Sequence, residues 1–356
     1  MRQHIAKRLF GAALALAAIS GTAQAVPGGT ITPLITSGAL PDTPAAHVDP
    51  NTAASRFSGV VSINIRYDGL SYICSGALVG KRQVVSAGHC VDTNGNGSLI
   101  DLNKPGSDVR VVFNASSTPG DPGRAVVTAT KVQMNPNYAG FGNCPAGVPG
   151  FCVNDDLAVI TLGQDAPASA KIYKLAGQQL QANTRIIMAG YGTSGDGING
   201  YTISPDFRVK RTGENIVDIF DGDDEQGFNG PNEVWYADFD GNGHDQFCEW
   251  NLACSAQLPN NRESGIGGGD SGGPSFIEQY GELMLIATNT FGGTPDGLVD
   301  GAFGTYFGGI VLHSYLDYLS RATNGAIQVV PEPAGMLVFA LGLLALAGAR
   351  RRNQRH

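Results

Sequence analysis

The sequence predicts an all-β protein, and its composition and patterning support this prediction. Glycine accounts for 50 of the 356 residues, and charged residues for only 15%, against roughly 25% in an average soluble domain. The hydrophobic fraction of 42% is enough for a packed core. Apolar residues fall in short runs between Gly, Pro and Asn turns, which is typical of a barrel or sandwich rather than of βαβ units. The net charge of −8 argues against nucleic-acid binding as the main function.

The expected strands begin near residue 57. Val61, Ile63 and Ile65 alternate with polar neighbours, as in a strand with one buried face. Further β-like runs follow at residues 77–79, 84–85, 109–113, 125–130, 157–162, 185–189 and 283–288. One helix is expected near residues 313–321, where it would close the domain.

The N-terminal 25 residues have the features of a cleaved secretory signal peptide. Basic residues precede the apolar run at 9–19, and the segment ends in Ala23-Gln24-Ala25, an A-x-A site. Residues 26–55 are rich in Pro, Gly, Thr and Ala and have no strand or helix period. We therefore expect a signal peptide at 1–25, a linker or pro-segment at 26–55 and a folded domain at 56–324.

The C-terminus combines three features in a fixed order. Pro331-Glu332-Pro333 is followed by the apolar run 334–349 and then by three arginines, which predicts a short transmembrane segment with a positive anchor. This order resembles the PEP-CTERM sorting tail of Gram-negative bacteria. The resemblance implies a tail at 325–356, a sorting enzyme that acts on it, transient membrane association, and a location at the cell surface or outside the cell. A plain membrane anchor is the alternative.

All six cysteines lie in the expected exported part, which fits an oxidising compartment. The sequence leaves their connectivity open, and three nearest-neighbour pairs are the simplest arrangement. No C-x-x-C or paired-His spacing is present, which argues against a Cys/His metal cluster. The pairs are Cys74/Cys90, Cys144/Cys152 and Cys248/Cys254.

Three segments carry residues suited to nucleophilic catalysis. They are Ser86–Cys90 with His89, Asn154–Val159 with two adjacent aspartates, and Gly269–Pro274 with Ser271. A serine nucleophile needs a base, and the base needs a carboxylate to hold one tautomer. Two N–H donors must also face the developing oxyanion, and the glycines would let the backbone turn for this purpose. Asp156 is preferred to Asp155 because the expected strand starts directly after it.

These residues resemble the chymotrypsin/trypsin family of serine proteases, which has the same chain order of His, Asp and Ser. Gly190-Tyr191-Gly192 is similar to a G-W-G turn of that family, and Cys74 and Cys90 stand where it has the disulfide that brackets the base. Gly304-Thr305-Tyr306 and the final helix match its carboxyl end. The resemblance spans most of residues 57–321.

The resemblance implies a fold of two six-stranded antiparallel β-barrels with a C-terminal helix, and a trypsin-like protease domain at 56–324. It assigns His89 as general base, Asp156 as its orienting partner, Ser271 as nucleophile, and Gly269 with Ser271 as the oxyanion hole. No Ile-Val-Gly-Gly stands before Phe57 to pair with Asp270. Either another residue pairs with Asp270, or no zymogen step is needed.

The expected substrate pocket differs from that of trypsin. Gly265 stands where trypsin has the acid that selects Lys or Arg, so we expect cleavage after small or apolar residues. The residues expected around the pocket are Gly265, Thr288, Thr290 and Gly304.

An acidic segment at 212–261 contains no Lys or Arg. Part of it fits the spacing of an EF-hand calcium loop. Asp245 at the usual apolar position and the lack of flanking amphipathic helices favour a solvated loop, with structural calcium as the alternative. Catalysis itself is expected to need no cofactor. The residues in the loop spacing are Asp238, Asp240, Asn242, Gly243 and Glu249.

The sequence therefore predicts a secreted serine endopeptidase that cleaves protein or peptide substrates through an acyl-enzyme. The alternative is a non-catalytic surface or matrix protein that uses a protease fold for binding.

Overall fold

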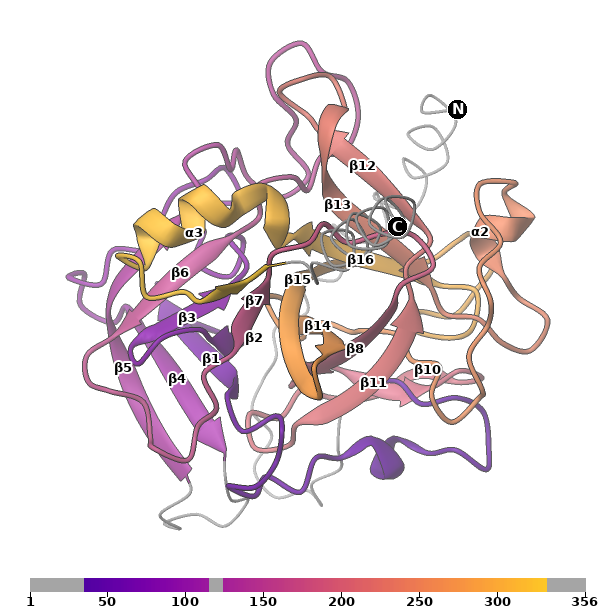
Figure 1. The fold of residues 1–356 in the computed structure, drawn as a ribbon, viewed down its shortest axis with the longest axis horizontal. Coiled ribbons are helices and arrows are strands. Elements are labelled where there is room, and N and C mark those ends of the chain that lie inside the picture. The colour runs from indigo at the N-terminus through magenta and orange to yellow at the C-terminus, as the bar shows by residue number, and fades with distance from the viewer. Residues whose placement is uncertain (1–34, 115–123, 332–356) are drawn as a thin grey trace, which may run out of the picture.

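The computed structural model describes residues 35–114 and 124–331, and it is built mainly of β-strands in two halves (Figure 1). The first half is a closed six-stranded barrel in the order β1-β2-β3-β6-β5-β4, in which β1 also pairs with β4. Its strands are β1 (Val60–Tyr67), β2 (Leu70–Leu78), β3 (Gln83–Ser86), β4 (Asp108–Asn114), β5 (Arg124–Met134) and β6 (Ala158–Leu162).

Alternation of side chains explains the interior of this barrel. Val61, Ile63 and Ile65 are fully buried and belong to one hydrophobic cluster. Successive residues of a strand point to opposite faces, so alternate apolar residues line one surface. The alternation predicted for this strand is confirmed.

The second half is a sheet of nine strands. The main path runs β11-β8-β14-β15-β16-β13-β12, and β7 joins β15 and β17 beside it. The strands are β7 (Lys174–Ala176), β8 (Arg185–Gly190), β11 (Arg211–Ile216), β12 (Ile219–Asp223), β13 (Asn229–Asp238), β14 (Pro274–Gln279), β15 (Glu282–Gly293), β16 (Tyr306–Val311) and β17 (Val329–Val330). A separate hairpin contains β9 (Ser194–Asp196) and β10 (Gly200–Ile203).

This sheet curls until its distant strands approach each other. The Asn215 side-chain amide of β11 donates to the carbonyl oxygen of Asp238 at the end of β13, at 2.8 Å. The all-β, chymotrypsin-like class is thus confirmed. The second half has more than the six strands expected, because β12 extends a hairpin within the acidic segment and β7 and β17 add short pairings.

A hydrophobic cluster joins the two halves. It includes Val60 and Val159 of the first barrel together with Ala189, Phe276 and Leu285 of the second sheet. The loops that follow β3, precede β6 and precede β14 contact one another through His89, Asp156, Cys90 and Ser271. The halves are therefore held in a fixed relation at the place where the candidate site lies.

The helices are short. The one predicted near residues 313–321 is confirmed as η2 (Leu312–Tyr315) followed by α3 (Leu316–Ala322). Its Tyr318 hydroxyl donates to the carbonyl oxygen of Gln133 in β5 at 3.0 Å, so this C-terminal helix packs on the first barrel (Figure 1). The remaining helices are η1 (Pro44–His47) and α2 (Gln246–Glu249).

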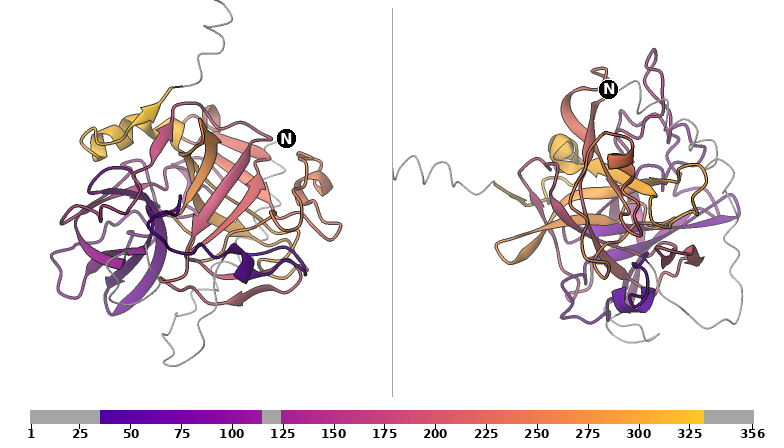
Figure 2. Two further views of the ribbon diagram at one scale, coloured as in Figure 1. Left: turned by 60° about the horizontal axis from the view of Figure 1, so that its bottom comes forward. Right: turned by 90° about the vertical axis from the view of Figure 1, so that its right-hand side faces the viewer.

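Residues 35–49, here called the N-terminal strap, run across the second half (Figure 2, left). Ile35, Thr36 and Ser37 are fully buried. Backbone hydrogen bonds fasten the strap at both ends, from Ser37 N to Gly195 O and from Asp49 N to Lys210 O, each 2.9 Å. The strap lies within the segment expected as a linker or pro-segment. It has no hydrophobic period because backbone and polar contacts hold it in place.

Three disulfides join nearest-neighbour cysteines, namely Cys74–Cys90, Cys144–Cys152 and Cys248–Cys254. The expected signal peptide and the apolar run at 334–349 lie outside the described residues. Within residues 35–114 and 124–331, no helix is long and apolar enough to cross a membrane.

Candidate active site

Strand pairing brings His89 and Asp156 together. His89 follows β3 and Asp156 precedes β6, and these strands pair with Ser86 opposite Ala158. Asp156 is fully buried. Its Oδ2 lies 2.7 Å from His89 Nδ1, and its Oδ1 accepts the His89 backbone N–H at 2.7 Å. An ionised carboxylate only accepts hydrogen bonds, so Nδ1 carries the proton and Nε2 of the neutral ring is the basic atom.

Opposing effects set the basicity of His89. Burial lowers the pKa of the imidazole, but the charge and hydrogen bond of Asp156 outweigh burial and raise the pKa above 6.5, with a further contribution from Asp92. The ring also contacts Phe141 edge-on, with centroids 5.1 Å apart. The imidazole is therefore held in one orientation with Nε2 as its available nitrogen.

The two adjacent aspartates have different surroundings. Asp155 adopts a left-handed backbone conformation with φ of 63°. Its Oδ1 accepts the Asn135 side-chain amide at 2.9 Å, and its N–H donates to the Tyr315 hydroxyl at 3.0 Å. This turn directs Asp155 away from His89, so Asp156 alone contacts the imidazole.

Ser271 lies in a loop fastened to both halves. Its carbonyl oxygen accepts the N–H of Ser75 in β2 at 2.8 Å. Gly272 N–H donates to Asn289 O in β15 at 2.7 Å. Gly272 has φ of 75°, and a Cβ there would lie 2.1 Å from Ser86 Oγ. Glycine is thus required beside Ser271 both for the turn and for the close approach to the first barrel.

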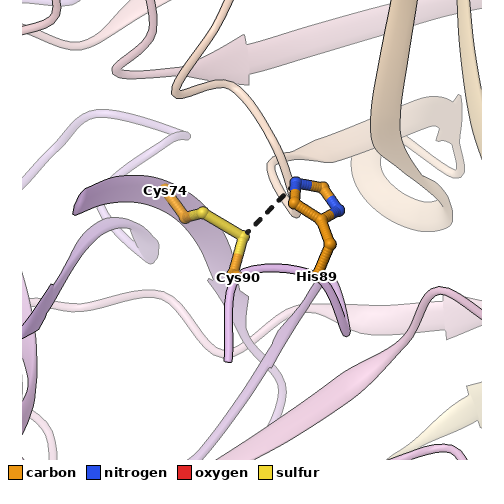
Figure 3. Close-up of side chains that lie close together, drawn as sticks. All are labelled: Cys74, His89 and Cys90. Carbon is orange, nitrogen blue, oxygen red and sulfur yellow. Dashed lines mark hydrogen bonds between the residues drawn. A yellow bond between two sulfur atoms is a disulfide. The ribbon is translucent and has the colours of Figure 1, made fainter. Parts of the chain in front are cut away.

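A disulfide lies between His89 and Ser271. Cys90 Sγ is 3.9 Å from His89 Nε2 and 3.8 Å from the carbonyl oxygen of Ser271. Figure 3 shows Cys74, Cys90 and the imidazole side by side. Because metal binding by cysteine requires a thiolate, the disulfide-bonded sulfurs do not make this group a metal site.

Two backbone donors near Ser271 are free. Within the described ranges, neither the Gly269 N–H nor the Ser271 N–H has a hydrogen-bond acceptor. Gly269 has φ of 104°, and its carbonyl oxygen accepts the Ser75 hydroxyl at 2.9 Å. The Gly269 peptide is therefore held from its carbonyl side, and its N–H is available to another acceptor.

Asp270 anchors the same loop from inside the protein. It is fully buried, with Oδ1 accepting Gly192 N–H at 2.7 Å and Oδ2 accepting Gly267 N–H at 2.9 Å. Burial raises the pKa of Asp270 to about 6, against the effect of the two N–H donors and of Arg211. These bonds connect the Ser271 loop to the turn at residues 190–192.

The four residues expected around the substrate pocket have different surroundings in the structure. Gly265 is buried, and its N–H donates to Thr36 Oγ1 of the strap at 2.7 Å. Thr288 and Thr290 are buried in β15, and among the described residues their hydroxyls have no hydrogen-bond partner. Gly304 precedes β16, and its N–H donates to Phe239 O at 2.8 Å. Thr36 was missed by sequence reasoning, because it is 229 residues from Gly265.

Part of the acidic segment forms a compact group. Carboxylate oxygens of Asp238, Asp240 and Asp245 lie within 4.8 Å of one another. Burial, followed by the charges of Asp238 and Glu263, raises the pKa of Asp240 to about 9. Asp240 Oδ1 is buried and has no partner among the described residues. These features fit a cation site, since oxygen ligands suit calcium.

The other two expected calcium ligands, Asn242 and Glu249, lie outside this group. Asn242 is exposed. Glu249 has a side chain 49% exposed, with Oε1 3.7 Å from His244 Nδ1. Asp245 caps α2 by accepting Cys248 N–H at 2.9 Å. The chain thus turns so that Asp245, rather than Glu249, contributes the third carboxylate.

A second acidic group was not predicted from the sequence. It contains Asp155, Asp224, Glu225 and Glu233, with carboxylate oxygens within 4.8 Å of one another. Burial and then the charge of Glu233 raise the pKa of Asp155 to about 9. Its members come from three separate stretches of chain, which is why no local motif marks them.

Comparison with known proteins relates this geometry to one family. The model of the Trypsin family matches residues 48–206. A relative from Xenopus tropicalis named "Inactive serine protease PAMR1" is 31% identical over 117 residues, which is 32% of this chain and 14% of that protein. Residues 48–206 are thus similar to the Trypsin family, and the described fold is consistent with a chymotrypsin-like one. The match spans only about a seventh of that relative.

Proposed function

We propose that this trypsin-like chain is a secreted serine endopeptidase that hydrolyses peptide bonds through an acyl-enzyme. The observation that carries the proposal is the His89–Asp156 pair, in which a fully buried carboxylate holds Nδ1 at 2.7 Å. Buried carboxylates next to a partly accessible imidazole are typical of a general base prepared for proton transfer.

In the proposed reaction, Ser271 Oγ attacks the carbonyl carbon of the substrate and His89 Nε2 takes the hydroxyl proton. Asp156 stabilises the imidazolium, and the free N–H groups of Gly269 and Ser271 bind the oxyanion. His89 then gives the proton to the leaving amine, and an acyl-enzyme remains on Ser271. Water, activated by His89, hydrolyses this ester and regenerates the serine.

The proposed preference is for small or apolar residues before the cleaved bond. Gly265 supplies no carboxylate, and Thr36 Oγ1 accepts its N–H, so the strap contributes neutral atoms there. Thr288 and Thr290 add neutral hydroxyls in β15. A peptide-library profile should therefore be dominated by small and apolar residues, and a profile dominated by Arg or Lys would contradict this.

The second candidate function is non-catalytic binding on a cell surface or matrix, and the relative named as inactive favours it. Hydrolysis of a protein substrate by the purified exported chain distinguishes the two. The endopeptidase predicts fragments that disappear in Ser271→Ala, whereas a binding protein yields none. A contaminating protease would give the same fragments with the wild-type protein and with Ser271→Ala.

We further propose export by a signal peptide at 1–25 and sorting through the tail at 325–356, with transient membrane association. Three disulfides support an oxidising destination. Deleting residues 331–356 should release the protein into the medium if the tail directs a sorting enzyme. Unchanged surface retention would contradict that role.

Asp238, Asp240 and Asp245 are the residues proposed to hold a structural calcium ion. Bound calcium would offset the negative charge of three neighbouring carboxylates, two of which are buried. No catalytic step depends on it.

A further inference from the structure

Arg211 is a fully buried basic residue at the start of β11. Its Nε donates to the carbonyl oxygen of Pro44 in the strap at 2.7 Å. Its two terminal nitrogens, Nη1 and Nη2, have no hydrogen-bond partner within the described residues. A buried charge without compensation is costly. Burial lowers the pKa of Arg211 to about 8, so a negative group nearby would favour its charged form.

The strand pairing shows where that group is. Arg211 pairs with Gly190 of β8, and side chains of directly paired residues lie on the same face of a sheet. A Cβ on Gly190 would lie 2.2 Å from Asp270 Oδ1. The Asp270 carboxylate therefore occupies the side-chain position of Gly190, on the same face as Arg211 but without a direct ion pair to it among the described residues.

The Asp270 carboxylate is itself incompletely compensated. Each oxygen accepts one backbone N–H, from Gly192 and from Gly267. Arg211 is the basic side chain whose charge acts on Asp270, and the Asp270 charge acts in turn on Arg211. Tyr201 of β10 is, among the described residues, the other titratable group that the charge of Asp270 affects.

The strap covers Arg211 from its other side. Val48 bridges to Arg211 in an antiparallel arrangement. His47 Nδ1 lies 3.0 Å from the carbonyl oxygen of Thr212, and its Nε2 lies 2.7 Å from Asp42. The strap therefore shields Arg211 from solvent. At this contact the strap is uncleaved, and the chain continues on both sides of it.

We propose that Arg211 is a positioning residue that serves as the internal counter-ion of Asp270, so that the Ser271 loop is held in its reactive form while the strap remains attached. The inference rests on the proposed protease function. It means that this chain assembles its oxyanion donors without a newly cleaved N-terminus. Cleavage within the strap would instead uncover Arg211 and loosen the loop.

The test uses the exported protein with the strap intact, as shown by its mass before and after reaction. A fluorophosphonate reacts with an activated serine by forming an oxygen–phosphorus bond and releasing fluoride, so its rate reports the state of Ser271. Arg211→Met removes the charge, and Arg211→Lys keeps a positive charge. Lys210→Met is the matched control, because the equally buried Lys210 pairs with Asp49 at 3.2 Å instead of facing Asp270.

We expect wild-type protein to react without cleavage of the strap. Arg211→Met should slow the reaction by about a hundredfold or more, the size of losing an oxyanion donor. Arg211→Lys and added guanidinium should restore part of the rate, and Lys210→Met should keep most of it. Hydrogen exchange at residues 265–273 should accelerate in Arg211→Met and stay near the wild-type level in Lys210→Met.

A change in pH dependence provides a second readout. Loss of Arg211 leaves burial to raise the pKa of Asp270 further, so the acidic limb of the reaction should move to higher pH in Arg211→Met and remain in place in Lys210→Met. Among the described residues, the titratable side chains that interact with Asp270 are Arg211 and Tyr201, and only Arg211 is changed. His89 is unchanged in both variants.

Two results would overturn the proposal. One is an Arg211→Met protein that reacts at the wild-type rate with an unchanged acidic limb. The other is a wild-type protein that reacts only after cleavage within or before the strap. A wild-type protein that never reacts would instead contradict the protease function. If Arg211→Met does not fold, Arg211→Lys and the mass of the reacting wild-type species still decide the question.

Discussion

Asp156 accepts two hydrogen bonds from one residue, His89, through the backbone N–H and through Nδ1, each at 2.7 Å. Both oxygens of a fully buried carboxylate are thereby used to fix the position and the ring orientation of the same histidine. The pairing of β3 with β6 produces this arrangement before any substrate is present.

Replacing Asp156 with Asn should lower kcat by about 10⁴-fold, because the amide no longer enforces the tautomer with Nε2 free. Peptide hydrolysis by the purified variant measures this. Asp155→Asn is the control, since Asp155 contacts Asn135 and Tyr315 instead of His89. A larger loss in Asp155→Asn than in Asp156→Asn would contradict the assignment.

Raising the pH through the pKa of His89 should increase activity and decrease the stability of the fold. The base must be neutral, so activity should rise with pH through the His89 pKa, which lies above 6.5. The raised pKa means that the His89–Asp156 interaction stabilises the fold fully below about pH 6.5. This contribution is lost as pH rises through the folded-state pKa. NMR titration of His89 measures the value, and a midpoint below 6.5 would contradict the account.

Gly272→Ala and Gly281→Ala form a matched pair, since both glycines have positive φ, 75° and 74°. Alanine in this conformation costs about 1–2 kcal/mol at either position. At Gly272 the Cβ would also lie 2.1 Å from Ser86 Oγ, whereas at Gly281 nothing lies within 4 Å. Overpacking should therefore make Gly272→Ala about 1–3 kcal/mol less stable than Gly281→Ala, as measured by urea unfolding. Equal losses would show that the loop does not pack closely on the first barrel.

Thr36→Val should destabilise the fold by about 1–3 kcal/mol, because the buried Gly265 N–H loses its acceptor at 2.7 Å. Thr36→Ser keeps the hydroxyl and should restore most of this stability. We also expect KM for short apolar substrates to rise in Thr36→Val, since Gly265 would shift. Thermal unfolding and steady-state kinetics test both effects. A fully stable Thr36→Val would mean that the strap does not support the pocket.

Calcium should raise the melting temperature, and Asp240→Asn should remove this effect because Asp240 lies within the carboxylate group. Glu249→Gln should keep it, since Glu249 is half exposed and faces His244. Calorimetry with calcium and with a chelator distinguishes these variants. A calcium response that is lost only in Glu249→Gln would favour the EF-hand spacing instead.

The residues predicted from the sequence are those marked by local motifs. The alternation at Val61, Ile63 and Ile65 predicts a strand, because burial of one face leaves a period in the sequence. The residues that were missed act over long separations. The strap has no period, and its contact between Thr36 and Gly265 joins positions 229 residues apart. Arg211 gives no local signal either, because its role depends on the pairing of β11 with β8.

The acidic segment also shows that local motifs alone do not predict which residues lie close together. Its spacing suggests Glu249 as a ligand, whereas the cap that Asp245 forms on α2 places Asp245 beside Asp238 and Asp240. Spacing along the chain predicts a ligand set only when the backbone follows the reference loop. A capping residue four positions before Glu249 is enough to change which carboxylate is near.

Fluorophosphonate labelling, followed by mass mapping of the labelled peptide, tests most directly whether Ser271 is an activated nucleophile. We expect a single adduct, on Ser271, that disappears in Ser271→Ala and forms much more slowly in His89→Ala. The absence of any adduct on correctly disulfide-bonded, folded protein would contradict the claim that this chain is a serine protease.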